Sequence, residues 1–171
     1  RDGFYTGTVA EKIAAEMQQH NGIISTDDLK NYQAVWREPI KGTYKNYTIV
    51  SMPPPSSGGI ALMQLLNMME NYPIKKWGFH SVNSVSIMTE AEKRVYADRA
   101  TWLGDPDFTK VPKNELISKS YSASRMQNVD TNSVTPAAQI KAGTFTGYES
   151  EETTHFSIVD KYGNAVSITT T

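Results

Sequence analysis

The sequence predicts a mixed α/β (α+β) fold in which helices cover the faces of antiparallel hairpins. Apolar residues recur at helical spacing over residues 62–69 and 84–99. Apolar and polar residues alternate on both sides of short polar turns in residues 40–52 and 153–171. With 171 residues and a hydrophobic fraction of 39%, the chain is long enough to bury a core.

Composition excludes several classes of protein. A net charge of −1 and a pI near 6.3 do not favour binding to nucleic acid. No apolar run is long enough to span a membrane. Cysteine is absent, and the three histidines lack zinc-motif spacing, so we expect neither thiol chemistry nor a metal site. The chain starts at Arg1 and stops within an alternating strand, so we expect a piece of a longer protein.

The N-terminal third contains two predicted helices and a hairpin. The first helix has its apolar positions at Val9, Ile13, Ala14 and Met17, and Asn21-Gly22 ends it. Ser25 or Thr26 caps a short helical turn over residues 27–32. Residues 40–44 and 47–52 form two strands around a turn at Lys45-Asn46.

The stretch Ser56-Ser57-Gly58-Gly59 precedes a helix whose apolar side is predicted to be Leu62, Leu65, Leu66 and Met69. Two interpretations of this stretch stay open. Backbone N–H groups at a helix start can bind an anion. The alternative is a tight turn in which glycine allows close packing.

The strongest helix prediction is residues 84–99, with a buried stripe of Val85, Met88, Ala91 and Val95 and a solvated side of Glu90, Glu92, Lys93 and Arg94. Asp98 and Arg99 at its end indicate a structural ion pair rather than a substrate clamp. Residues 104–107 read as a turn with side-chain-to-backbone bonds rather than a cation site. Residues 114–126 hold one or two short helices, and residues 128–150 are predicted to be a loose surface loop.

The terminal segment reads as a hairpin whose turn is Asp160 to Asn164. With Tyr162 at the turn centre, Thr153 lies opposite Thr171. Because side chains alternate across a strand, one face is mostly apolar and the other carries hydroxyl groups. The hydroxyl-bearing residues of that polar face, together with one histidine, are Thr153, His155, Ser157, Ser167, Thr169 and Thr171.

Thr153 has two interpretations. An internal threonine in a strand is commonly just a good strand former. A threonine at a chain N-terminus, in contrast, can use its own α-amine as a base and act as a nucleophile. That amine exists only after the Glu152–Thr153 bond is broken, and the same hydroxyl could attack the preceding carbonyl to break it.

Four motifs, taken together and in order, resemble the γ-glutamyltranspeptidase family of N-terminal-nucleophile (Ntn) hydrolases. The resemblance covers essentially the whole chain. The motifs are Ser51-Met52-Pro53-Pro54-Pro55-Ser56-Ser57-Gly58-Gly59-Ile60, Glu90-Ala91-Glu92-Lys93 with Tyr96-Ala97-Asp98-Arg99, Leu103-Gly104-Asp105-Pro106-Asp107-Phe108, and Thr153-Thr154-His155-Phe156-Ser157-Ile158-Val159-Asp160 with Gly163-Asn164-Ala165-Val166.

The resemblance implies an αββα four-layer sandwich, present here only in part. Residues 1–152 then belong to the end of the large subunit and residues 153–171 to the first hairpin of the small subunit, in one incomplete domain. Cleavage between Glu152 and Thr153 makes Thr153 the nucleophile, and Thr171 supports it. His155 is read as structural, because in this family the freed amine is the base.

The implied reaction is γ-glutamyl transfer or hydrolysis on glutathione and related γ-glutamyl compounds, with water, amino acids or peptides as acceptors and no cofactor. The remainder of the same precursor is the implied protein partner, and a periplasmic or extracellular location is implied. The alternatives are a glutaryl-type acylase, a poly-γ-glutamate transpeptidase, or an unprocessed, non-catalytic binding module.

The family's residues for gripping the substrate carboxylate and amino group, and for the oxyanion pocket, lie outside these 171 residues. One oxyanion donor is commonly worth about 10²–10³ in rate. We therefore expect this chain alone to be inactive toward a γ-glutamyl anilide, and turnover comparable to that of a complete enzyme would contradict this.

Overall fold

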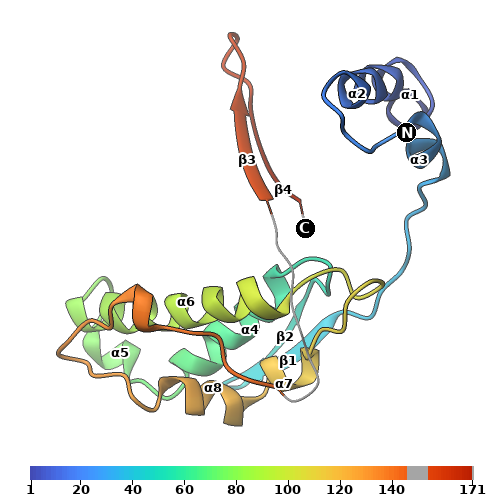
Figure 1. The fold of residues 1–171 in the computed structure, drawn as a ribbon. Coiled ribbons are helices and arrows are strands. Elements are labelled where there is room, and N and C mark those ends of the chain that lie inside the picture. The colour runs from blue at the N-terminus through green and yellow to red at the C-terminus, as the bar shows by residue number, and fades with distance from the viewer. Residues whose placement is uncertain (146–153, 171) are drawn as a thin grey trace. The chain divides into compact units, whose positions relative to one another are not determined.

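The computed structural model describes residues 1–145 and 154–170, and Figure 1 traces their path. The chain divides into two compact units, residues 1–37 and 38–171. The expectation of a single incomplete domain stays a prediction. The predicted subunit boundary between residues 152 and 153 lies outside the described residues and stays a prediction.

The first unit contains three helices: α1 (Asp2–Tyr5), α2 (Thr8–Gln19) and α3 (Thr26–Asn31). Ser25 is the N-cap of α3, where its Oγ accepts the Asp28 N–H at 3.2 Å. In return, the Asp28 carboxylate accepts the Ser25 N–H at 2.8 Å. This reciprocal capping box satisfies backbone donors that the first helical turn leaves unpaired, and it confirms Ser25 rather than Thr26 as the cap.

The second unit begins with the predicted hairpin. β1 (Ile40–Tyr44) pairs antiparallel with β2 (Tyr47–Ser51), from Ile40 opposite Ser51 to Tyr44 opposite Tyr47. The turn at Lys45-Asn46 is confirmed, and Lys45 takes a left-handed backbone with φ of 50°. Ile40, at the start of β1, is buried in the same core cluster as Ile60 and Met63.

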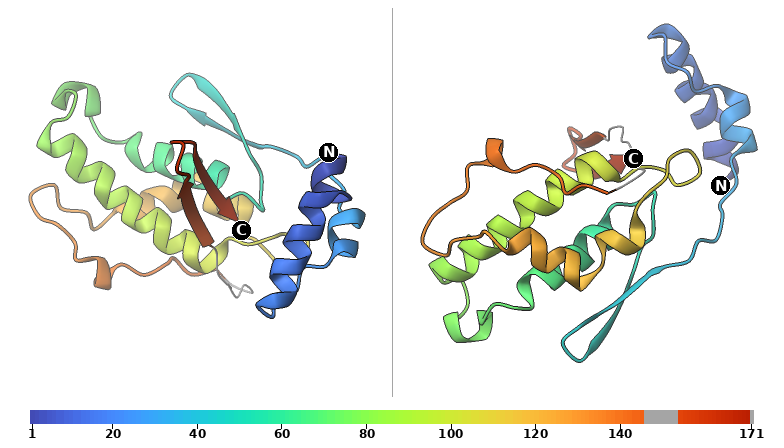
Figure 2. Two further views of the ribbon diagram at one scale, coloured as in Figure 1. Left: turned by 90° about the horizontal axis from the view of Figure 1, so that it is seen from above. Right: turned by 60° about the horizontal axis from the view of Figure 1, so that its bottom comes forward.

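Helices follow this hairpin along the chain, and Figure 2 shows the long helix α6 lying beside α4. Two groups of buried apolar residues form the core, one centred on Ile60 and Met63 and the other on Met68 and Ile87. The helices are α4 (Gly58–Met69), α5 (Ile74–Trp77), α6 (Val82–Trp102), α7 (Lys113–Leu116), α8 (Lys119–Met126) and a 3₁₀ turn, η1 (Ala137–Gln139).

The predicted apolar side of α4 is wrong at Leu62, whereas Leu65 and Met69 are partly buried and pack against the core. Leu62 is 41% exposed, whereas Met63 and the polar Gln64 are buried. Most residues of this helix are apolar, so their spacing could not identify which side faces the core.

The helix α6 is confirmed and longer than expected, and its predicted buried stripe is confirmed at Ala91 and Val95 but wrong at Val85 and Met88. Val85 and Met88 are 43% and 44% exposed, and two residues assigned to solvent, Glu90 and Arg94, are buried. The core-facing residues are Ser84, Ile87, Glu90, Ala91, Arg94, Val95 and Asp98.

Close packing explains Gly59 at the start of α4. A Cβ at this position would overlap the backbone carbonyl of Met52, whereas a Cβ at Gly58 would meet only Ser56 Oγ at 3.5 Å. Of the two interpretations of this stretch, the structure bears out the tight turn with close packing.

We predict that Gly59→Ala destabilises the protein by about 1–3 kcal/mol, because backbone must move to admit the methyl group. Gly58→Ala is the matched control and is expected to be neutral or slightly stabilising, since alanine favours helix. Thermal unfolding of the two variants checks this, and equal midpoints would contradict it.

The last described element is the hairpin of β3 (Thr154–Val159) and β4 (Ala165–Thr170). Its strands are antiparallel, with Thr154 opposite Thr170 and Val159 opposite Ala165. Within the described part of the chain, no helix is both long and apolar enough to cross a lipid bilayer.

Candidate nucleophile hairpin and the buried carboxylates of α6

The turn of the terminal hairpin is built around Asp160. Its Oδ1 accepts the N–H groups of Tyr162 at 2.8 Å and Asn164 at 3.0 Å, and its Oδ2 accepts the Asn164 side-chain amide at 2.8 Å. These bonds, first of all that from the Asn164 side chain, lower the pKa of the Asp160 carboxyl. Gly163 has φ of 84°, a conformation that favours glycine. The predicted turn over residues 160–164 is confirmed.

The register of this hairpin is the one expected from sequence over its described length. His155 lies opposite Thr169, and Thr154 opposite Thr170 is the outermost described pair. The three predicted site residues, Glu152, Thr153 and Thr171, lie outside the described residues, so their roles stay predictions.

Glu90 is the centre of a buried ionic cluster on α6. Its side chain is 1% exposed and forms ion pairs with Lys93 and with Arg94 Nη1, the latter at 2.6 Å. Its Oε1 also accepts the Thr135 N–H at 3.0 Å. Burial by itself raises the pKa of the Glu90 carboxyl, but hydrogen bonds from Lys93, Arg94 and Thr135 outweigh burial and bring the pKa down to about 2.

This lowered pKa predicts the pH dependence of stability. The folded-state pKa of Glu90 lies below its ordinary value of 4.5, so its stabilisation is fully present above pH 4.5 and is lost as the pH falls toward 2. We expect the difference in thermal midpoint between the wild type and Glu90→Gln to be largest near neutral pH and to shrink between pH 4.5 and 2. A difference that stays constant over this range would contradict the assignment.

Asp98 is fully buried and has four partners, none of which is Arg99. The predicted Asp98–Arg99 ion pair was therefore wrong. Neighbouring residues of a helix point in different directions, and Arg99 Nε instead donates to Ser57 Oγ at 3.0 Å. The partners of the Asp98 carboxylate are Arg125 Nη2 at 3.1 Å, Gln64 Nε2 at 3.0 Å, Tyr121 Oη at 2.8 Å and the Gly143 N–H at 2.8 Å.

The Tyr121 phenol is the donor in its bond to Asp98. Burial first, and then the charge of Asp98, raise the pKa of Tyr121 above its ordinary value, so the phenol keeps its proton. The carboxylate thus has a hydrogen-bond donor on each oxygen and one cation beside it. Such a saturated, buried carboxylate fixes the elements around it and is not available as a base.

The segment predicted as a loose loop is held at several points up to residue 145. Arg125 donates to the Lys141 carbonyl at 2.7 Å, and Trp102 Nε1 donates to the Gly143 carbonyl at 2.8 Å. The Phe145 ring packs against the rings of Trp102 and Tyr121, at centroid distances of 5.3 and 4.9 Å. The prediction of an exposed loop is confirmed for residues 128–145, but the loop is not loose, because polar composition does not reveal backbone groups that pair with buried side chains.

Both backbone polar groups of Gly143 are paired, and a Cβ there would overlap the Tyr121 hydroxyl. We refer to Asp98, Trp102, Tyr121 and Arg125 as the clasp. The clasp holds residues 141–145, which stand shortly before the predicted cleavage bond in the sequence.

The turn at residues 104–107 is confirmed in the form expected. Asp105 Oδ1 accepts the Asp107 N–H at 3.0 Å, and the Asp105 carbonyl accepts the N–H groups of Phe108 and Thr109. The described residues contain no group of three or more histidine, aspartate or glutamate side chains that could hold a metal ion.

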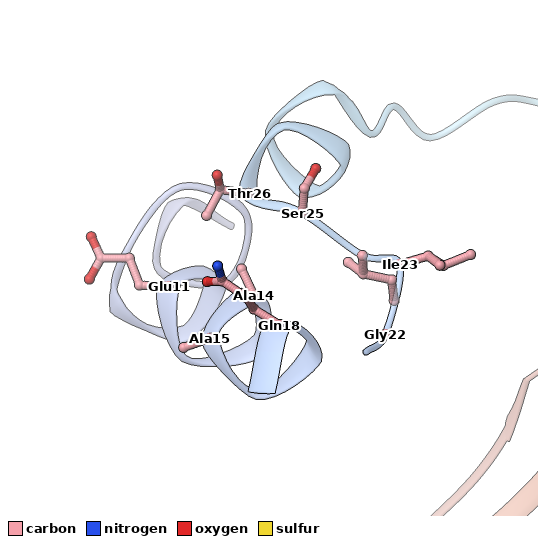
Figure 3. Close-up of a pocket in the computed structure, with 9 residues that line it drawn as sticks. Glu11, Ala14, Ala15, Gln18, Gly22, Ile23, Ser25 and Thr26 are labelled. Atoms are coloured by element: carbon pink, nitrogen blue, oxygen red, sulfur yellow. The ribbon is translucent and has the colours of Figure 1, made fainter. Parts of the chain in front are cut away.

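The first unit has a hollow of about 490 Å³ between α2 and the segment leading into α3 (Figure 3). Among its lining residues only Glu11 carries a charge, and small side chains such as Ala14 and Ala15 dominate its wall. It contains none of the predicted site residues.

Sequence reasoning missed the buried polar residues that join α6 to the segment before the hairpin. Glu90, Arg94 and Asp98 follow each other at four-residue spacing beside the buried Ala91 and Val95. That spacing was visible in the sequence. Charged residues are rarely buried, so the amphipathic pattern placed Glu90 and Arg94 in solvent, and Asp98 was assigned to an ion pair with Arg99.

Comparison with known proteins identifies the family. Residues 1–171 match the family model of γ-glutamyltranspeptidase. The chain is 52% identical over 170 residues to the glutathione hydrolase proenzyme of Escherichia coli K12, covering 99% of this chain and 29% of that protein. It is 40% identical to the acylase ACY 1 proenzyme of Pseudomonas sp. SE83, covering 99% of this chain and 30% of that protein.

The fold agrees with this assignment. The crystal structure of Helicobacter pylori γ-glutamyltranspeptidase matches with a TM-score of 0.75 and 42% identity, over 88% of this chain and 43% of that one. The expected fold class, a mixed α/β Ntn-hydrolase fold present in part, is confirmed. The chain spans about three tenths of the length of the curated relatives described above. It belongs to the γ-glutamyltranspeptidase family of Ntn hydrolases.

Proposed function

We propose that this chain is part of a glutathione hydrolase precursor that cleaves itself between Glu152 and Thr153 and then transfers γ-glutamyl groups. The observation that carries the proposal is the 52% identity, along 99% of the chain, with a protein named glutathione hydrolase proenzyme. In this proposal residues 1–152 end the large subunit and residues 153–171 begin the small one.

The proposed self-cleavage uses the Thr153 hydroxyl. The hydroxyl oxygen attacks the Glu152 carbonyl carbon, the peptide nitrogen takes a proton and leaves, and an ester joins the two parts. Water then hydrolyses the ester, which frees the Glu152 carboxylate and the Thr153 hydroxyl beside the α-amine that the first step released.

In the proposed transfer reaction the freed α-amine takes the proton of the Thr153 hydroxyl as its oxygen attacks the γ-amide carbon of glutathione. The amine of the leaving group departs with a proton, and a γ-glutamyl ester forms on Thr153. Water, an amino acid or a peptide then accepts the γ-glutamyl group. Nucleophile and base come from one residue, so no cofactor is needed.

The hairpin supports the role proposed for Thr171. The described register pairs Thr154 with Thr170, and continuing this register by one residue would place Thr153 opposite Thr171. Directly opposed residues of an antiparallel pair have Cβ atoms about 4.5–5.5 Å apart, a separation at which two hydroxyl groups can hydrogen-bond.

Intact-mass measurement of the complete precursor tests the cleavage. The proposal expects two fragments, the smaller beginning at Thr153, together with release of the chromogenic amine from a γ-glutamyl anilide. A single uncleaved chain without turnover would instead favour a non-catalytic binding module.

A second candidate function is favoured by the 40% identity with the acylase ACY 1 proenzyme. A matched pair of substrates distinguishes a glutathione hydrolase from an acylase, because a glutaryl anilide lacks only the α-amino group of a γ-glutamyl anilide. We expect preference for the γ-glutamyl compound, and preference for the glutaryl compound would assign an acylase. Faster transfer from poly-γ-glutamate than from either would assign a polymer transpeptidase.

We also propose that the protein acts in the periplasm or outside the cell. The support for this is the family resemblance, and cell fractionation with immunodetection of the small subunit tests it.

A further inference from the structure

We propose that helices α4 and α8 enclose a binding site for one water molecule, which belongs to the folded protein. Within the described part of the chain, four buried side-chain atoms have no hydrogen-bond partner, and these atoms form the site. They are Gln64 Oε1, Asn67 Oδ1, Ser122 Oγ and Arg125 Nε. The inference concerns the packing of the second unit and does not depend on the proposed function.

Burial makes an unpaired state of these atoms costly. Gln64 and Ser122 are 0% exposed, and Asn67 is 2% exposed. The Arg125 side chain reaches the surface in part, but its Nε is buried. A buried polar atom without a partner has lost its hydrogen bonds to solvent and has gained none in exchange. The large majority of buried polar atoms in native proteins are paired, either with protein or with ordered water.

Contacts that start from α4 bring these side chains toward one place. Gln64 Nε2 and Arg125 Nη2 bind the two oxygens of the Asp98 carboxylate, at 3.0 and 3.1 Å, so the ends of these two side chains are neighbours. Asn67 follows Gln64 by three residues and therefore lies on the same side of α4. Its Nδ2 donates to the Ile117 carbonyl at 2.8 Å, shortly before α8 begins.

Ser122 lies on α8 between these points of attachment. The preceding residue, Tyr121, donates to Asp98 Oδ2, the same oxygen that accepts from Gln64. Arg125 follows Ser122 by three residues and lies on the same side of α8. Each helix thus contributes two side chains spaced three residues apart, and α4 packs against α8. This arrangement favours one shared partner over four separate ones.

The orientations of the two amides identify which atoms are acceptors. If the Gln64 amide were turned over, its oxygen would lie against the Asp98 carboxylate. If the Asn67 amide were turned over, its oxygen would lie against the Ile117 carbonyl. Both alternatives place two acceptors together. The two unpaired amide atoms are therefore oxygens, and each needs a donor.

The remaining two atoms supply donors. Arg125 Nε can only donate, and the Ser122 hydroxyl can donate by rotating its hydrogen. The site therefore offers two acceptors and two donors. A water molecule donates twice and accepts twice, so one molecule satisfies all four atoms.

The same set of groups excludes a small ion. A cation would lie beside the Arg125 guanidinium, and an anion would lie against two amide oxygens and near the Asp98 carboxylate. A neutral molecule with both donors and acceptors meets neither repulsion. Buried waters in proteins make about three hydrogen bonds each, which agrees with a site of this composition.

A high-resolution crystal structure of the complete protein tests the site directly. We expect one density peak at about 2.5–3.2 Å from at least three of the four atoms. The same peak is expected in Ser122→Ala, because three partners remain. Absence of a peak, a peak that reaches fewer than three of the atoms, or direct hydrogen bonds among the four atoms would overturn the inference.

Thermal unfolding gives a second measurement that does not need crystals. A buried hydroxyl that is bonded to water stabilises the fold, whereas one without any partner destabilises it, so its removal has opposite signs in the two cases. Ser124→Ala is the matched control, because Ser124 is an exposed serine on the same helix. We expect Ser122→Ala to have the lower thermal midpoint of the two. A midpoint equal to or above that of Ser124→Ala would overturn the inference.

Discussion

The complete precursor with Thr153→Ala is expected to remain a single chain and to show no measurable γ-glutamyl transfer. The substitution removes the oxygen proposed to attack the Glu152 carbonyl, and without cleavage the α-amine that would act as base never forms. Loss of a nucleophile in another hydrolase costs about 10⁶ in kcat, so we expect residual turnover near background.

Thr153→Ser supplies the informative comparison. It keeps a hydroxyl at the same atom, so cleavage should continue, and the small subunit should then begin with serine. Thr48→Ala, at an exposed strand position on β2, is the control for losing a threonine from a strand and should leave cleavage unchanged. Cleavage of the Thr153→Ala precursor at the same bond would refute the mechanism.

Glu90→Ala is expected to destabilise the protein by about 3–5 kcal/mol, the usual scale for breaking a buried ion pair from one side. Arg94 would lose its carboxylate partner while remaining in the interior, and the Thr135 N–H would lose its acceptor. An uncompensated buried charge costs more than the hydrogen bonds themselves.

Glu92→Ala is the matched control, because Glu92 is an exposed glutamate two residues away on the same helix. Its effect should stay within about 0.5 kcal/mol. The free energy of unfolding of both variants is measured in urea. Each variant also carries Thr153→Ala, so that every protein compared is an uncleaved chain. Similar losses in the two variants would show that the Glu90 cluster is not the stabilising feature it is described to be.

Much of the local structure could be predicted from sequence. The hairpin turns at residues 45–46 and 160–164 follow from residue types that accept tight backbone geometry, and Ser25 with Asp28 forms the cap that its spacing indicates. These features depend on residues a few positions apart. The interacting residues of each feature therefore lie together in one short stretch of the sequence.

The faces of the helices could not be predicted in the same way. On α4 apolar residues lie all around the helix, and on α6 the residues assigned to solvent include the buried Glu90 and Arg94. Which side of a helix is buried depends on what packs against it. For Glu90 that is the backbone of Thr135, 45 positions away.

By itself, the sequence determined the family, the alternation of strands in the terminal hairpin and the choice of Thr153 as the residue to test. These follow from motifs and from the period-two pattern of a strand. Only the tertiary structure showed that Asp98 is joined to Arg125, Tyr121, Gln64 and Gly143. The physical reason is that a carboxylate is buried only where donors from separate segments meet, and folding alone brings those segments together.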